Sequence, residues 1–404
     1  MPKSKLPQSI FILGLVSFFT DVSSDMIYPL LPIFLVSYLG ASMAFMGIIE
    51  GIAESTAAFF MLFSGVWADR AKDRSKLVLA GYSVSSFFRP LAAVAWHPVC
   101  ILFTRFFDRV GKGIRTSPRD ALIADSTDPH QRGAAFGLQR SLDHAGAVFG
   151  PLTAGLLMYL GVTNLRVVFA LAAVPALVSV VLIAWKIREV RAYPLPQAQE
   201  RGFKLSPPKG RLKVYLIILF VFILSCSSDA FLLLKASESG VKPSMLPFLW
   251  MTFSAVKALS VFPLGKLSDK LGRRHMLLAG WTLYTIVYMG FGLASTAWQV
   301  SLLFVCYGLF YGFTEGTERA LLSEYALTYE RGQAFGWYYF VVGMGALPAS
   351  LIFGFIWQHH GSKTAFLVSA AISACAAFGL FVFLKLAPSA KIPVPSPAPK
   401  PTDL

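Results

Sequence analysis

The sequence predicts an all-α integral membrane protein of twelve transmembrane helices in two pseudo-symmetric six-helix bundles. Of its 404 residues, 55% are hydrophobic and only 14% are charged, which is too apolar for a soluble protein of this length. About a dozen apolar segments, joined by short connectors, reach the roughly 20 residues that a helix needs to cross a bilayer. In addition, several short motifs of the first half recur in the second half.

The connectors divide the chain into helices and domains. The expected helices are residues 8–38, 43–67, 77–96, 99–122, 133–158, 164–187, 213–238, 244–268, 275–295, 298–325, 332–358 and 363–387. The expected domains are an N-terminal bundle (1–187), a central loop (188–212), a C-terminal bundle (213–387) and a disordered Pro-rich tail (388–404). The first apolar segment is long and is followed by no small-residue cleavage site, so we expect it to be retained as a helix.

The basic residues indicate the orientation in the membrane. The net charge is +15, and many of the cations lie in the connector over residues 186–213, whereas alternate connectors such as 40–43 carry none. This positive-inside pattern predicts a multi-pass protein of the inner membrane with both termini and the central loop in the cytoplasm. It also accounts for the charge through contact with the lipid bilayer, so we expect no nucleic-acid partner.

Enzyme signatures are weak. Cys100, Cys226, Cys306 and Cys375 lack paired spacing, which favours neither a disulfide nor a metal site. The Gly-Lys-Gly at 111–113 is too short to be a phosphate-binding loop. We therefore expect no enzymatic activity, no cofactor and no metal, and we expect any energy for transport to come from an ion gradient.

An internal repeat supports the two-bundle plan. Ser-Ser-Asp occurs at 23–25 and at 227–229, and Arg-Gly-x-Ala-Phe-Gly occurs at 132–137 and at 331–336. A Gly-x-x-x-Asp pair occurs at Gly65 and Asp69 and again at Gly265 and Asp269. Two parallel repeats related by an axis along the membrane normal are a known transporter plan, with the substrate site near the midplane.

These motifs resemble the major facilitator superfamily over nearly the whole chain. The family's loop motif after helix 2 is matched in the second half by Gly265, Asp269, Lys270, Gly272, Arg273 and Arg274. In the first half Gly65, Asp69, Arg70 and Arg74 fit, whereas Lys72 and Asp73 depart from the pattern. In the family this loop locks and releases the outward-facing state, which implies a gate here, with Asp125 as an acidic partner. The alternative is a turn that needs glycine and charge only for topology.

The fifth expected helix carries a second motif. Gly137, Gly146, Gly150, Pro151 and Gly155 resemble a family motif linked to antiporters. Small residues at these steps also allow tight helix packing, and the second half echoes part of the pattern. The resemblance therefore favours antiport over symport only slightly.

Charged residues inside the expected helices are the candidate cavity residues, because each is costly in hydrocarbon and faces a partner or water. They are Asp21, Asp25, Glu50, Glu54, Arg105, Asp108, Arg109, Arg115, Arg140, Asp143, His144, Asp229, Lys257, Glu315, Glu318 and Arg319. In the resembled family, helices 1, 4, 7 and 10 line the cavity, and all four carry charge here. For any single residue a buried ion pair is an equally good account, but collectively the cavity interpretation is favoured.

Proton coupling needs a titratable group. Asp21 and Asp25, and likewise Glu50 and Glu54, lie four residues apart, so that each member of a pair opposes the other's ionisation. His144 is a further candidate because histidine titrates in the physiological range.

The predicted function is a monomeric secondary active transporter that moves a small polar or charged organic solute by alternating access. We expect proton coupling, with antiport slightly favoured. The alternatives are a proton symporter that imports an organic anion, amino acid or metal chelate, and an uncoupled facilitator. The basic stripe of the fourth helix favours a solute with a carboxylate.

Overall fold

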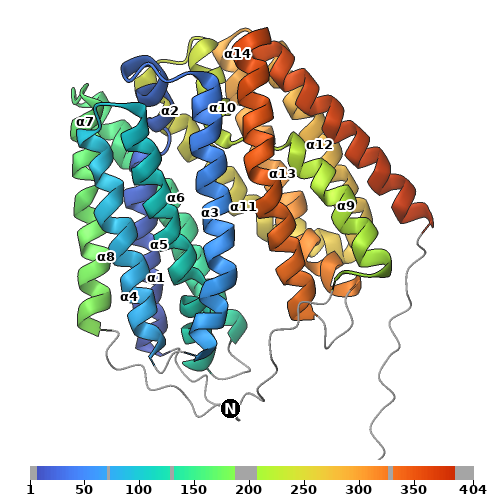
Figure 1. Ribbon diagram of the computed structural model, residues 1–404, viewed down its shortest axis with the longest axis horizontal. Coiled ribbons are helices and arrows are strands. Elements are labelled where there is room, and N and C mark those ends of the chain that lie inside the picture. Colours follow the sequence, from blue (N-terminus) through green and yellow to red (C-terminus); the bar gives the residue numbers. More distant parts are fainter. Residues whose placement is uncertain (1–6, 71–72, 128–131, 187–206, 326–330, 387–404) are drawn as a thin grey trace, which may run out of the picture.

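The computed structural model describes residues 7–70, 73–127, 132–186, 207–325 and 331–386, and every regular element in these ranges is a helix (Figure 1). The first bundle contains α1 (Gln8–Ile27), α2 (Leu31–Ile33), η1 (Phe34–Tyr38), α3 (Met43–Arg70), α4 (Arg74–Phe88), η2 (Arg89–Val94), α5 (Pro98–Asp125), α6 (Arg132–Tyr159), α7 (Leu165–Leu171) and α8 (Ala173–Lys186). The second contains α9 (Gly210–Ser225), α10 (Asp229–Glu238), η5 (Pro243–Met245), α11 (Leu246–Leu271), α12 (Arg273–Leu293), α13 (Ala297–Tyr325) and α14 (Arg331–Leu386).

Length and hydropathy qualify nine segments of the described chain as membrane spans. α5 is not among the nine, because its windows carry too many charged residues, and α6 is not among them either. α14 counts once although its backbone breaks at Gly361, where φ is 80°. Two helices therefore meet at that turn, and the observed boundaries lie within a few residues of those expected. The total of twelve crossings stays a prediction, since it requires α5 and α6 to cross as well.

One helical segment of each bundle is interrupted near its Ser-Ser-Asp motif. α1 ends at Ile27, and Pro29 and Pro32 follow, each of which lacks the N–H that a continuous helix needs. Residues 226–228 separate α9 from α10, and the Ser228 hydroxyl accepts a hydrogen bond from the Ala230 N–H at 3.3 Å. Both interruptions place an aspartate, Asp25 or Asp229, close to a helix end.

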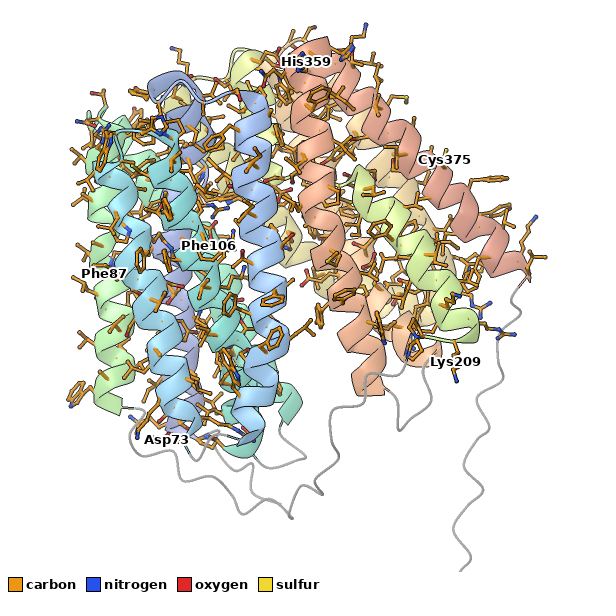
Figure 2. The ribbon with its side chains drawn as sticks, in the orientation of Figure 1. Asp73, Phe87, Phe106, Lys209, His359 and Cys375 are labelled. Carbon is orange, nitrogen blue, oxygen red and sulfur yellow. The ribbon has the colours of Figure 1, made fainter. Side chains whose placement is uncertain are left out.

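The outer surface is apolar, as a lipid-facing surface requires. Phe87 of α4, for example, is 66% exposed and points outward (Figure 2). The interior of the second bundle is aromatic, with the Phe222 and Trp281 rings stacked at a centroid distance of 4.0 Å. The interior of the first bundle is charged instead, and it contains most of the predicted site residues.

The bundles meet at the upper end of Figure 1, through α3 and α14. The Ser55 hydroxyl donates to the Gly343 carbonyl at 2.8 Å, and the Ala44 N–H donates to Gln358 Oε1 at 3.1 Å. Gly47 and Gly51 let the two backbones approach, because any Cβ there would clash with the backbone of α14.

The glycines near the lower end of Figure 1 lack such close contacts. A Cβ built at Gly137, Gly265, Gly316 or Gly336 would meet no described atom within 4 Å. These four glycines lie on α6, α11, α13 and α14, near the ends of the helices that point downward in Figure 1. In this conformation the bundles are therefore joined at the upper end and apart at the lower end.

Candidate functional site

α5 organises the charged interior of the first bundle. The helix begins after His97, whose Nδ1 accepts a hydrogen bond from the Val99 N–H at 3.2 Å. A Cβ at Gly111 would lie 2.5 Å from the Gly81 carbonyl oxygen, so glycine here brings α4 against α5. The basic side chains of α5 recur at steps of three and four residues and therefore share one face. Two of them, Arg105 and Arg109, reach acids on α3.

Arg105 of α5 and Glu50 of α3 form a buried ion pair. Nε of Arg105 donates to Oε1 of Glu50 at 3.1 Å, and Nη2 donates to both carboxylate oxygens at 2.9 and 2.8 Å. The Ser228 hydroxyl donates to the same carboxylate at 3.1 Å from the second bundle. The Arg105 guanidinium also lies 5.3 Å from the centre of the Tyr28 ring. Glu50 therefore connects three helices and both bundles.

Asp108 is paired with a residue that the sequence argument overlooked. Arg89, the first residue of η2, donates to Asp108 Oδ1 at 2.7 Å and to the Thr20 carbonyl at 2.9 Å. Both side chains of the pair are only 7% exposed. An arginine beside a proline inside an apolar span was the available signal, since such a charge requires a buried partner.

The remaining arginines of α5 also have partners. Arg109 pairs with Glu54 at 3.0 Å, and the Glu54 side chain is 47% exposed. Arg115 donates to the Ser85 hydroxyl at 2.6 Å, and its guanidinium lies 4.5 Å from the centre of the Tyr82 ring. Glu50 and Glu54 thus each have their own arginine and do not act as an opposed pair of acids.

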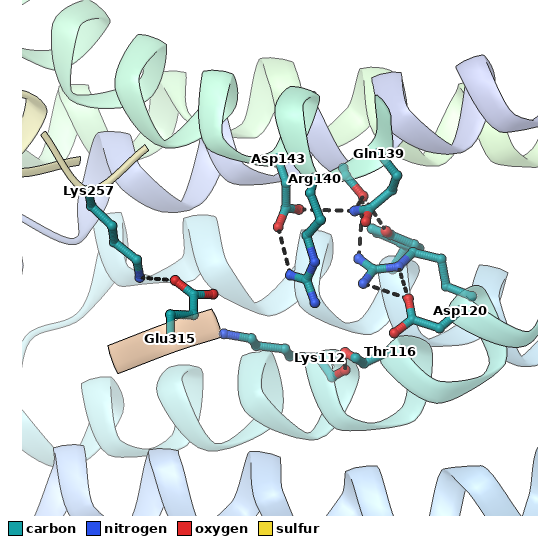
Figure 3. Close-up of polar contacts among 11 residues, drawn as sticks. Lys112, Thr116, Asp120, Gln139, Arg140, Asp143, Lys257 and Glu315 are labelled. Carbon is teal, nitrogen blue, oxygen red and sulfur yellow. Dashed lines mark hydrogen bonds and ion pairs between the residues drawn. The ribbon is translucent and has the colours of Figure 1, made fainter. Parts of the chain in front are cut away.

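Lys112 of α5 differs from these arginines. Within the described part of the chain, no carboxylate lies within 4 Å of its ammonium group. The side chain points from α5 toward Glu315 of α13 (Figure 3). Among the described residues, Lys112 and Arg115 are thus the cations of the α5 stripe without a direct acidic partner, and Arg115 is bound by Ser85 and the Tyr82 ring instead.

A second polar cluster joins α1 to α6 (Figure 3). Arg140 and Gln139 donate to the Asp143 carboxylate, each at 3.4 Å. The Asp21 carboxyl group of α1 interacts electrostatically with Asp143 and with Asp25. The helices approach because a Cβ at Gly146 would lie 2.5 Å from the Phe18 carbonyl oxygen of α1. Asp21 thus has two acidic neighbours, Asp25 on its own helix and Asp143 on α6.

Small residues of the α6 motif explain this approach. A Cβ at Gly150 would lie 2.6 Å from the Val22 carbonyl oxygen of α1. A Cβ at Gly155 would lie 2.7 Å from the Phe248 ring of α11, in the other bundle. Pro151 lies within the helix between them. The motif therefore supplies contacts to both bundles.

The two repeated aspartates bind aromatic donors of the second bundle. Asp25 accepts a hydrogen bond from Trp250 Nε1 at 3.1 Å, and the Trp250 ring packs on Tyr28 at a centroid distance of 5.0 Å. Asp229 accepts one from the Tyr307 hydroxyl at 2.7 Å. Tyr307 also shares a hydrogen bond with Tyr311 at 3.3 Å.

α11 and α13 of the second bundle carry the other charges. Lys257 lies 3.9 Å from Glu315 and 4.1 Å from the centre of the Tyr311 ring. His144 of α6 interacts electrostatically with both members of this pair, across the space between the bundles. Glu318 accepts hydrogen bonds from Trp281 Nε1 at 3.2 Å and from the Tyr338 hydroxyl at 2.8 Å.

The proposed gate is described only in part. Arg74 begins α4 after Asp73, which caps the helix by accepting from the Ser75 N–H at 3.0 Å. Gly272, at φ 93°, joins α11 to α12, where Arg273 and Arg274 begin the helix. The following predicted residues have side chains outside the described part: Gly65, Asp69, Arg70, Asp125, Asp269 and Arg319. The gate stays a prediction.

An enclosed pocket lies inside the first bundle, between α1, η2 and α5. Its lining includes Ser24, Tyr28, Arg89, Arg105 and Asp108. It has room for about one water molecule. It is therefore too small for an organic solute.

Comparison with known proteins agrees with this architecture. Residues 13–235 and 214–403 each match the sequence profile described as Major Facilitator Superfamily. The chain is 32% identical to an uncharacterized MFS-type transporter of Methanocaldococcus jannaschii, over 88% of this chain and 89% of that protein. It is 25% identical to the multidrug resistance protein MdtH of Citrobacter koseri, over 77% of each.

Solved structures share the fold at low identity. A bacterial homolog of the human lysosomal transporter Spinster, in an inward-facing and unoccupied conformation, has a TM-score of 0.76 at 16% identity, covering 95% of this chain and 98% of that one. The nucleoside transporter NupG has a TM-score of 0.76 at 12% identity, covering 94% and 100%. The helical architecture, the repeated halves and the profile match together show that this chain belongs to the Major Facilitator Superfamily of membrane transporters.

Proposed function

We propose that the protein is a proton-coupled secondary active transporter that moves a small charged organic solute by alternating access. One observation carries the proposal: charged side chains of both bundles are exposed between them. Glu54 is 47% and Arg140 46% exposed, and Lys257 and Glu315 are 27% and 25% exposed. Such groups are costly in hydrocarbon, so a water-filled path between the bundles accounts for them best.

Alternating access requires the contacts at the upper end to break while the lower end closes. The contacts to be broken include Ser228 with Glu50 and Trp250 with Asp25. All are hydrogen bonds between polar groups that water would satisfy after opening, so rocking of one bundle against the other has a modest cost. Basic residues flank the lower end, where Figure 2 shows Lys209 at the start of α9. Arg211 and Lys213 follow it in α9, and Lys270 and Arg273 lie at the junction of α11 and α12. By the positive-inside rule this end faces the cytoplasm, so the present conformation opens inward.

The solute carries a carboxylate or a similar anionic group, and Lys112 binds it. The arginines of α5 are held by partners of the protein itself, whereas Lys112 is not. A lysine ammonium retains three donors for a ligand. MdtH is named for multidrug resistance and NupG for nucleosides, so the test also includes a cationic drug and a nucleoside.

The α6 glycines do not decide between antiport and symport, because their contacts to α1 and α11 give them a packing role. The direction of proton movement must therefore be measured. Proteoliposomes of the full chain, loaded with a pH dye, receive lactate, glutamate, uridine, ethidium or ferric citrate outside. We expect lactate or glutamate to produce a pH change whose sign identifies symport or antiport.

Lys112→Met tests the solute contact. We expect at least a tenfold loss of labelled lactate or glutamate uptake, because the neutral side chain removes the cation that binds the carboxylate. The matched control is Lys242→Met, since Lys242 is exposed beyond the end of α10, away from the space between the bundles. Undiminished uptake by Lys112→Met, or uptake of ethidium and uridine alone, contradicts the carboxylate assignment. A solute flux that does not depend on pH would instead assign the protein to the uncoupled facilitators.

A further inference from the structure

A groove lies on the surface of the second bundle, between the start of α9 and the end of α14. Its volume is about 380 Å³, which is the size of a pocket that holds a small ligand. Its α9 wall is formed by Arg211, Val214 and Ile218. These residues recur at steps of three and four, so they share one face of the helix.

The α14 wall of the groove has the same regularity. It is formed by Gly379, Val382, Phe383 and Leu386, which also share one helical face. A Cβ at Gly379 would come no closer than 3.9 Å to the Ile218 side chain. Glycine therefore leaves the groove open where the two walls face each other. Each wall covers seven residue steps, so the groove is about 10 Å long.

The apolar part of the groove is open to the surrounding lipid. Leu386 is 78% exposed and Val214 is 45% exposed. Water is a poor occupant of an apolar groove, because covering such walls with hydrocarbon removes apolar surface from water. In a membrane these walls therefore favour an acyl chain.

One end of the groove is basic. Arg211 lines it, Lys209 immediately precedes α9, and Lys385 lies in the last turn of α14. The Lys385 ammonium lies 4.5 Å from the centre of the exposed Phe381 ring. The first N–H groups of α9 have no partner within the helix, and Lys209 supplies no side-chain cap for them. Neither α9 nor α14 contains an acidic residue, so this end attracts an anion.

We propose that the groove binds an anionic phospholipid of the adjacent leaflet. Its phosphodiester lies at the basic end, beside Arg211, Lys209 and Lys385, and one acyl chain lies between α9 and α14. A zwitterionic phospholipid carries an additional cation, which the basic residues repel. By the positive-inside rule the adjacent leaflet is the cytoplasmic one, whose surface is negative. The binding itself does not depend on the proposed transport.

Native mass spectrometry of the purified full chain in detergent measures this binding, with dioleoyl phosphatidylglycerol or dioleoyl phosphatidylcholine added. We expect phosphatidylglycerol to bind at the lower concentration. Arg211→Gln combined with Lys385→Gln should weaken its binding about twentyfold, because each basic group beside an anionic lipid contributes roughly fivefold.

The matched control is Lys242→Gln combined with Lys363→Gln. It makes the same change in charge at two exposed lysines, one beyond the end of α10 and one just after the turn at Gly361. This control should bind phosphatidylglycerol as the wild type does. Equal binding of the two lipids by the wild type, or equal losses in the two double variants, overturns the proposal.

Gly379→Leu tests the place of the acyl chain, because its side chain fills the groove while all three cations remain. Leucine is a better helix former than glycine, so we expect the variant to fold. It should bind phosphatidylglycerol at least tenfold more weakly, whereas Gly379→Ala should keep most of the affinity, since its Cβ makes only an ordinary contact.

Three results would show that the groove does not hold a lipid chain. The first is unchanged phosphatidylglycerol binding by Gly379→Leu. The second is displacement of the lipid by an equal concentration of glycerol phosphate, which has the headgroup chemistry without the chain. The third is a tenfold gain in lipid binding when residues 388–404 are removed, since the groove of the full chain would then be occupied by its own C-terminal segment.

Discussion

Glu50→Gln should be among the most destabilising single substitutions in the first bundle. The change is nearly isosteric, but it leaves the buried Arg105 guanidinium without a counter-charge. The amide Nε2 would also face the Arg105 donors that now reach both carboxylate oxygens at 2.8 to 3.1 Å. Removing one member of a buried ion pair costs about 3–5 kcal/mol. We expect a loss of that size in the free energy of unfolding.

The assay is equilibrium unfolding of the purified protein in mixed micelles of increasing dodecyl sulfate content, followed by circular dichroism. Glu54→Gln is the matched control, because Glu54 makes an equivalent pair with Arg109 but is 47% exposed. Its loss should stay below about 1 kcal/mol. The double variant Glu50→Leu with Arg105→Met should recover most of the stability, since replacing both members of a buried pair is often neutral. Equal losses for Glu50→Gln and Glu54→Gln would refute the reasoning.

Two further substitutions test other contacts. Ser228→Ala removes the hydrogen bond to Glu50 between the bundles, which is worth about 1 kcal/mol. The equilibrium between conformations should therefore shift severalfold toward the one that is open at the upper end. Unchanged spin-label distances across that end would contradict this expectation. Gly146→Val should disrupt the α1–α6 contact, because its Cβ would meet the Phe18 carbonyl oxygen at 2.5 Å. Gly137→Ala is the control and should be tolerated. A lower unfolding temperature for Gly137→Ala than for Gly146→Val would contradict the packing.

The helices and their repeat could be predicted because both depend on local sequence. Apolar length and charged connectors defined the spans to within a few residues. α5 and α6 were expected from the same apolar-segment argument, although neither is among the nine segments that length and hydropathy qualify. The spacing of the basic residues in the fourth expected helix predicted that they share one face.

The pairing of those residues could not be predicted, since it depends on how neighbouring helices are rotated. Spacing of four residues suggested that Asp21 opposes Asp25 and that Glu50 opposes Glu54. In the folded protein Asp143 of α6 acts on Asp21 in addition to Asp25, and each glutamate meets its own arginine of α5. Arg89 escaped notice because its partner, Asp108, is brought near only when α4 packs on α5.

The repeat also conceals an asymmetry that matters for the solute. α5 and α13 occupy corresponding places in the two halves, yet α5 carries arginines and Lys112, whereas α13 carries Tyr307, Tyr311 and Glu315. Asp25 and Asp229 correspond too, but one is bound by an indole N–H and the other by a phenol. A solute between the bundles would therefore meet an ammonium group on one side and aromatic rings on the other. That combination suits an anionic group attached to a partly apolar body, because a bare inorganic anion would gain little from the rings.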